Sequence, residues 1–241
     1  MSVRGFLAAS ALVFSAIASA ELPRVAIIID DMGYHLANGK RAIQLPGAVS
    51  FSFLPDAPRA RPLAEHAHAL DKDILLHLPL QAANDDAAPG PSEIHIDMSR
   101  ERLRHTLDEA LESVPHAIGV NGHRGSLLTQ HPGHMQWLME EIRGREPLFF
   151  IDSYTHHGSV ALQIAVENGV EAMKRDVFLD PDPSPEAIER EFERLKSLAR
   201  KRGRALAIGH PYPTTLDVLE RELPKLADEG FELVRVSELL R

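Results

Sequence analysis

The sequence predicts an α/β fold in which seven to eight parallel strands close, or nearly close, into a (β/α) barrel. Short apolar runs alternate with segments of helical periodicity along the whole chain after residue 20, which indicates parallel strands joined by crossover helices. No internal repeat and no long linker interrupts this alternation. We therefore expect residues 21–241 to form a single domain, with an open doubly wound sheet as the alternative architecture.

Eight segments are predicted to be strands because each is a short run rich in apolar or β-branched residues. They are residues 25–31, 48–54, 73–80, 117–121, 148–153, 176–179, 204–209 and 232–236. The first is the clearest, since the five consecutive apolar residues from Val25 to Ile29 are typical of a strand buried on both faces.

Six segments between these strands have helical periodicity: residues 59–70, 99–113, 132–144, 159–168, 185–202 and 216–228. Ser99 and Ser184 are predicted N-caps, and Gly203 should end the helix that Ser184 begins. Pro224 should kink or split the last helix. Residues 82–91 are rich in Ala, Asp, Asn and Pro and are predicted to form a surface loop.

The first twenty residues have the pattern of a secretory signal peptide. Arg4 supplies the positive region, an apolar stretch follows from Phe6 to Ile17, and Ala18-Ser19-Ala20 is a cleavage site before Glu21. An uncleaved N-terminal anchor is the alternative. No later stretch approaches the ~20 apolar residues that cross a bilayer, so we expect no integral membrane span after cleavage. The absence of cysteine is compatible with a bacterial periplasmic or secreted protein.

Composition and motifs exclude several functions. The net charge is −9 and the basic residues are scattered, which argues against a nucleic-acid partner. The chain contains no Gly-x-Ser-x-Gly motif, no P-loop, no Gly-x-Gly-x-x-Gly after the first strand and no cysteine nucleophile. Serine hydrolases, nucleotide hydrolases and nicotinamide dehydrogenases therefore have no motif to support them.

Asp30 and Asp31 directly follow the first strand and precede Gly33. Ligands of α/β folds bind at the carboxyl ends of parallel strands, so two carboxylates here suggest a functional site. Adjacent like charges repel unless a cation or a proton intervenes. A turn or a helix N-cap is the alternative, although a single Asp would suffice for a cap.

Polar residues also end the other predicted strands, and the strand ends of a barrel meet on one rim. These residues are His77, then Asn121, His123, Arg124 and Ser126 in a glycine-rich turn, then Asp152 and Ser153, and finally His210. Histidine nitrogen and carboxylate oxygen suit a divalent metal, most of all zinc. Each residue alone has an ordinary structural alternative: a core histidine, a solvated loop residue, a turn or a cap.

Six segments, in this order, resemble the blocks of the divergent polysaccharide deacetylases, which are related to the NodB-type carbohydrate esterases. They are Ile28-Ile29-Asp30-Asp31-Met32-Gly33, Leu76-His77-Leu78-Pro79-Leu80, Asn121-Gly122-His123-Arg124-Gly125-Ser126, Phe149-Phe150-Ile151-Asp152-Ser153, Arg175-Asp176-Val177-Phe178-Leu179-Asp180 and Ile208-Gly209-His210-Pro211. The resemblance implies a distorted (β/α) barrel that need not close completely. It also implies Asp30 as general base, a metal held by Asp31, His77 and His123, and His210 as general acid.

The sequence departs from this pattern at three points. The NodB-type pair of histidines spaced four apart is absent, so His77 and His123 would have to converge from different strands. Arg124 stands where the family usually has Met, and a basic residue there can weaken cation binding or recognise an anionic substrate. Tyr154 follows Asp152-Ser153 where the family commonly has a basic residue. Asn121, Arg124, Asp152 and Ser153 are the predicted substrate-binding residues.

Three functions remain compatible with the sequence. The first is an exported, metal-dependent hydrolase that removes acetyl groups from a polysaccharide or oligosaccharide of the cell envelope. The second is a non-catalytic carbohydrate-binding or envelope-assembly protein on the same scaffold. The third is another metal-dependent hydrolase, for example of phosphate esters. Bound metal would best separate the enzymatic hypotheses from the second one.

Overall fold

The computed structural model describes residues 21–84, 90–145 and 147–241. The predicted signal peptide and part of the predicted loop 82–91 lie outside these ranges. The strands are β1 Arg24–Met32, β2 Ser50–Phe53, β3 Ile74–Leu80, β4 Gly119–Arg124, β5 Phe149–Asp152, β6 Ala172–Lys174, β7 Val177–Phe178, β8 Arg204–Gly209 and β9 Glu232–Leu233. The α-helices are α1 Leu36–Ile43, α2 Ala60–Ala69, α3 Arg100–Ser113, α4 Pro132–Arg143, α5 Ala161–Glu167, α6 Pro185–Arg202, α7 Pro213–Glu222 and α8 Val236–Leu240.

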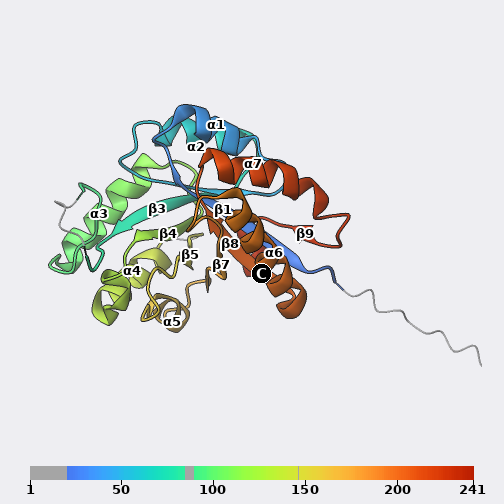
Figure 1. The fold of residues 1–241 in the computed structure, drawn as a ribbon. Coiled ribbons are helices and arrows are strands. Elements are labelled where there is room, and N and C mark those ends of the chain that lie inside the picture. Colours follow the sequence, from blue (N-terminus) through green and yellow to red (C-terminus); the bar gives the residue numbers. More distant parts are fainter. Residues whose placement is uncertain (1–20, 85–89, 146) are drawn as a thin grey trace, which may run out of the picture.

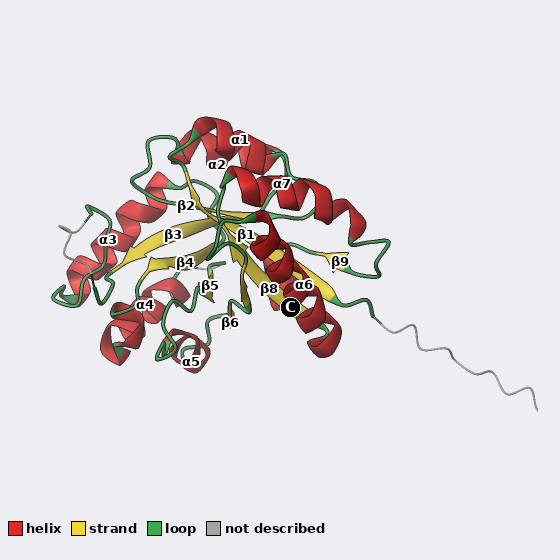
Figure 2. Ribbon diagram, viewed as in Figure 1, coloured by secondary structure: helices red, strands yellow, loops and turns green. Residues whose placement is uncertain are grey.

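All these strands belong to one parallel sheet with the order β6-β5-β4-β3-β2-β1-β8-β7, and β9 pairs with β1. The two ends of this order, β6 and β7, are separated in the chain only by Arg175 and Asp176, so the two edges of the sheet lie close together. Among the described strands, β6 and β7 do not pair with each other. The sheet is therefore a curled, incomplete (β/α) barrel with helices around it, as predicted, and not an open doubly wound sheet (Figures 1 and 2).

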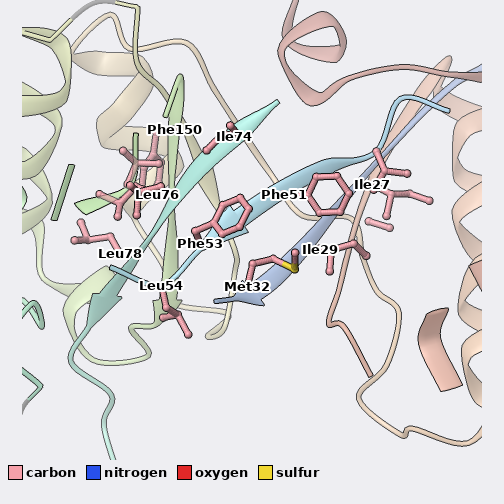
Figure 3. Close-up of a cluster of buried hydrophobic side chains, with 14 of the residues drawn as sticks. Ile27, Ile29, Met32, Phe51, Phe53, Leu54, Ile74, Leu76, Leu78 and Phe150 are labelled. Atoms are coloured by element: carbon pink, nitrogen blue, oxygen red, sulfur yellow. The ribbon is translucent and has the colours of Figure 1, made fainter. Parts of the chain in front are cut away.

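The barrel has an outer and an inner apolar layer because side chains alternate between the faces of each strand. Ile27 and Ile29 of β1 point outward and join Phe51 and Phe53 of β2 in the layer covered by helices (Figure 3). The inner layer contains Ala26, Ile28, Leu75, Phe149, Ile151, Leu206 and Ile208, and is filled from α8 by Val236 and Leu239. Burial of each large apolar side chain contributes about 1.5–3 kcal/mol to stability.

The structure confirms most of the predicted helix signals. The Ser99 hydroxyl accepts a hydrogen bond from the Arg102 amide and caps α3. Gly203 ends α6 in the left-handed conformation, with φ 82°. Pro224 does interrupt the last helix, because α7 ends at Glu222 and a short 3₁₀ segment follows. The Ser184 prediction is wrong in one respect, since its side chain makes no capping hydrogen bond.

Other predicted boundaries need correction. The last strand is only Glu232–Leu233, because the Ser50 hydroxyl accepts the Val236 amide hydrogen bond at the start of α8. The predicted glycine-rich turn after residue 121 is the continuation of β4, which pairs with β3 as far as Arg124. Helices α1 and α8 and strand β6 are not predicted by the sequence patterns. In the described ranges no helix is both long and apolar enough to cross a membrane.

Candidate active site

The inner face of the barrel changes from apolar to polar at the carboxyl ends of its strands. With a period of two, the residue two positions after each inner apolar residue points into the same space. This places Asp30 after Ile28, His77 after Leu75, Ser153 after Ile151 and His210 after Ile208. These four side chains line a cleft of about 220 Å³.

Asp31 reaches this cleft only because β1 is irregular. In a regular strand Asp31 would point to the opposite face from Asp30. The pairing of β1 with β2 changes register between Ile29 and Met32, and Asp31 has a φ of 54°. A bulge of this kind redirects a side chain, and backbone strain in a non-glycine residue is often found at functional sites. Asp30 and Asp31 thus both lie on the cleft.

Asp31, His77 and His123 form a compact group of possible metal ligands, from strands β1, β3 and β4. Asp31 Oδ1 lies 3.2 Å from His77 Nε2 and 3.1 Å from His123 Nδ1, and the two nitrogens are 3.2 Å apart. Ligands around a tetrahedral zinc ion would be about 3.3 Å apart. In the described part of the chain, the buried Asp31 Oδ1 has no hydrogen-bond partner. The donor set therefore fits a divalent metal.

The electrostatics of Asp31 agree with this fit. Burial acts to raise the pKa of its carboxyl group, but contacts with His123 and His77 outweigh that effect. Its pKa therefore lies far below the usual range, and the carboxylate is available as a ligand at any physiological pH. Because the NodB-type pair of histidines is absent, two histidines must converge from different strands. His77 and His123 do so, since they lie on the neighbouring strands β3 and β4.

Asn121 lies beneath the cleft and supports two of its residues. It is fully buried, and its side-chain amide donates to both carboxylate oxygens of Asp30, at 2.9 and 3.0 Å. Its Oδ1 consequently faces His77 Nδ1 at 3.0 Å and also accepts a hydrogen bond from the Ser52 hydroxyl. His77 Nδ1 must then be the donor, which leaves Nε2 to face Asp31. This position differs from the predicted substrate contact, because every polar atom of the side chain is already bonded inside the protein.

Asp30 is almost entirely buried, and its carboxylate is held by Asn121. Burial raises its pKa, and the nearby His77 and His210 only partly offset this. A carboxylate with a raised pKa is a better proton acceptor than an ordinary exposed one. The two neighbouring aspartates thus have opposite pKa shifts, which separates their chemical roles.

His210 is paired with Asp180, a residue to which the sequence reasoning assigned no role. His210 Nδ1 lies 2.9 Å from Asp180 Oδ1, and the His210 amide donates to Asp180 Oδ2 at 2.7 Å. The Thr215 hydroxyl holds the same carboxylate from α7. Burial acts to lower the pKa of His210, but the bond to Asp180 outweighs it and raises the pKa. Asp180 follows a predicted strand, so the pattern that singled out the other residues could have found it.

The remaining predicted substrate-binding residues have different positions. Arg124, with a φ of 63°, and Ser153 line the cleft. Asp152 is buried next to it and accepts hydrogen bonds from the Tyr154 amide and the Ser159 hydroxyl, so it shapes the following loop. Arg175, which the sequence reasoning also missed, lines the cleft and bonds the backbone oxygens of Ser153 and Tyr154.

The structure is an incomplete (β/α) barrel with a cluster of histidines and aspartates at the carboxyl ends of its strands, and a comparison with known families identifies the class of protein. The family model for divergent polysaccharide deacetylases matches residues 27–240, and the chain belongs to that family. The uncharacterized protein YibQ of Escherichia coli is 36% identical over 217 residues, which are 90% of this chain and 67% of YibQ. An uncharacterized protein of Haemophilus influenzae is 35% identical over 240 residues, covering 100% of this chain and 84% of its own length.

Solved structures with the same fold include a deacetylase and a pseudoenzyme. An uncharacterized protein from Agrobacterium tumefaciens has a TM-score of 0.87 at 23% identity, covering 92% of this chain and 90% of its own. The peptidoglycan deacetylase PdaC from Bacillus subtilis has a TM-score of 0.53 at 15% identity, with 90% of each chain covered. A pseudoenzyme of carbohydrate esterase family 4 from Bacillus anthracis has a TM-score of 0.54 at 13% identity, covering 91% of this chain and 66% of its own.

Proposed function

We propose that this protein is an exported, metal-dependent hydrolase that removes acetyl groups from a polysaccharide or oligosaccharide of the cell envelope. The observation that supports it most is the arrangement of two aspartates and three histidines on one cleft. The pKa of Asp30 is raised and that of Asp31 is lowered, so the two carboxyl groups suit different roles. Family membership supports a carbohydrate substrate.

The sequence pattern of residues 1–20 supports export to the periplasm. N-terminal sequencing of protein from the periplasm should find a mature chain that begins at Glu21.

Each residue of the site has a separate role in the proposed reaction. Asp31, His77 and His123 would hold the divalent ion, for which zinc is our proposal because of the one-oxygen, two-nitrogen donor set. When bound, such an ion supplies Lewis acidity and lowers the pKa of water. Asp30 would accept the proton of the attacking water, and Asn121 holds its carboxylate in place. His210 would donate a proton from Nε2 to the leaving nitrogen or oxygen, while Asp180 holds Nδ1.

A non-catalytic carbohydrate-binding role is the second candidate. It is favoured by the Bacillus anthracis pseudoenzyme, whose fold this chain shares, and by Arg124 on the wall of the cleft.

The experiment that separates the two candidate functions measures acetate release from acetylated envelope glycans by purified mature protein loaded with zinc. We expect release that a chelator abolishes and added zinc restores. Sugar binding without any release would support the second candidate.

The pH profile should depend on the pairing of His210 with Asp180. Because this pairing raises the pKa of His210, the proton-donating form persists to higher pH than an ordinary histidine allows, and activity falls as pH rises through the raised pKa. In Asp180→Asn the burial remains but the negative charge is lost, so the pKa of His210 should fall. We expect the high-pH limb of kcat/KM to move to lower pH.

The matched control for this prediction is Asp152→Asn, which also neutralises a buried aspartate at a strand end but does not contact His210. It should leave the position of the high-pH limb unchanged. In His210→Ala the limb should disappear along with most of the turnover. An unshifted limb in Asp180→Asn would assign the limb to another group.

A further inference from the structure

A second cleft, of about 370 Å³, continues from the catalytic one. The two clefts share Arg175 and Phe178 in their walls. The second cleft is otherwise bounded by Tyr154 in the loop after β5 and by Arg194 and Arg202 on α6. A chain of sugar units with one unit at Asp30 and His210 could therefore place a neighbouring unit in this second cleft.

The charge of the second cleft is opposite to that of the whole protein. Its walls carry four basic side chains, Lys174, Arg175, Arg194 and Arg202, and two acidic ones, Asp176 and Glu191. The local balance is therefore positive, whereas the chain has a net charge of −9. A locally positive cleft attracts an anion even on a protein whose net charge is negative.

The two carboxylates are already used by the two arginines of α6. Arg194 pairs with Glu191 and Arg202 pairs with Asp176, each at 2.8 Å. In the described ranges no carboxylate lies within ion-pair distance of Lys174 or Arg175. Asp30 and Asp152 act on Arg175 only from beyond ion-pair distance, so the two positive charges nearest the catalytic cleft are not held in ion pairs.

Neutral groups position Lys174 and Arg175 instead. Lys174 Nζ lies 4.2 Å from the centre of the Tyr154 ring, and the Arg175 guanidinium lies 4.8 Å from the centre of the Phe178 ring. Arg175 also donates from Nε to the Ser153 carbonyl at 2.7 Å. Such contacts hold a cation in place without neutralising it. Support of the loop after β5 accounts for Arg175, but it does not account for Lys174, whose side chain is exposed.

We infer that the substrate is an acidic glycan, and that a carboxylate or phosphate on the sugar next to the acetylated one binds at Lys174 and Arg175. This inference rests on the proposed function, since it specifies the substrate of the same site. An acidic substrate would also be consistent with Arg124, which adds a further basic side chain to the wall of the catalytic cleft.

The test compares three probes of similar length by calorimetry on the mature protein. They are neutral chitohexaose, chitohexaose carrying one phosphate monoester, and a hyaluronan hexasaccharide, which carries carboxylates; all three are N-acetylated. We expect at least one anionic probe to bind about tenfold more tightly than the neutral one at low salt. The advantage should shrink as NaCl rises from about 20 to about 500 mM, because salt screens exposed charges. The better anionic probe identifies the group that the cleft recognises.

Lys174→Gln should reduce affinity for that anionic probe about threefold to fivefold, the size of one exposed ion pair, and Lys174→Arg should retain it. Lys40→Gln is the matched control, since it removes the same charge from an exposed position on α1. Equal affinity for neutral and anionic probes, no binding of either anionic probe, or equal losses in both Gln variants would overturn the inference. Acetate release is measured in parallel. Binding of the anionic probe without release would count against the proposed hydrolysis alone.

Discussion

Replacing Asp31 with Ala should abolish metal binding and, with it, the proposed deacetylase activity. Asp31 Oδ1 is the atom that both His77 Nε2 and His123 Nδ1 approach, so its loss leaves two ligands where three converge. Loss of a residue that only supports a ligand typically costs 10–100-fold in metal affinity. Loss of a ligand itself should therefore cost more than about 100-fold. Elemental analysis of purified wild-type and variant protein measures this directly.

Two further variants make the Asp31 result specific. Asp31 has a positive φ, which Asn tolerates better than Ala, so Asp31→Asn removes the charge with less strain on the backbone. Asp228→Ala removes an exposed carboxylate outside the cleft and should leave both metal content and activity unchanged. If Asp31→Ala and Asp31→Asn both kept stoichiometric metal while folded by circular dichroism, the proposed ligand set would be wrong.

Asp30→Asn should lose most of the turnover and keep the metal. General base catalysis typically contributes about 10²–10⁴-fold, and we expect a decrease in kcat within that range. Because burial raises the pKa of Asp30, the wild-type base is protonated at a higher pH than an exposed aspartate as the solution is acidified. The low-pH limb of the rate profile should therefore disappear in the variant, because Asn has no carboxylate that takes up a proton as the pH falls.

Metal content decides how the Asp30 result is interpreted. Asp30 is not one of the three converging ligands, so Asp30→Asn should retain as much zinc as the wild type. Loss of metal and activity together would show that Asp30 supports the ligands rather than accepting a proton. Undiminished kcat with metal retained would remove Asp30 from the chemistry altogether.

The sequence by itself determined the strand order along the chain and the polar residues at the strand ends. These are local properties, since an apolar run followed by Asp or His can be recognised within a few residues, as in Val25–Asp31 and Leu75–His77. The same local reasoning located the Ser99 cap and the break at Pro224. It missed α1, which contains Asn38 and Gly39 and is held by bonds from Arg41 to Asp217 and Glu220 of α7.

Only the tertiary structure decided how these residues act together. The bulge that turns Asp31 into the cleft depends on pairing with β2, and the part of Asn121 in holding Asp30 joins residues 91 positions apart. Asp180 and His210 meet because β7 and β8 are neighbours, and Lys174 and Arg175 lie beside the cleft because the sheet curls until β6 approaches β7. Such contacts depend on strand pairing and backbone strain between distant segments, and no pattern of neighbouring residues encodes them.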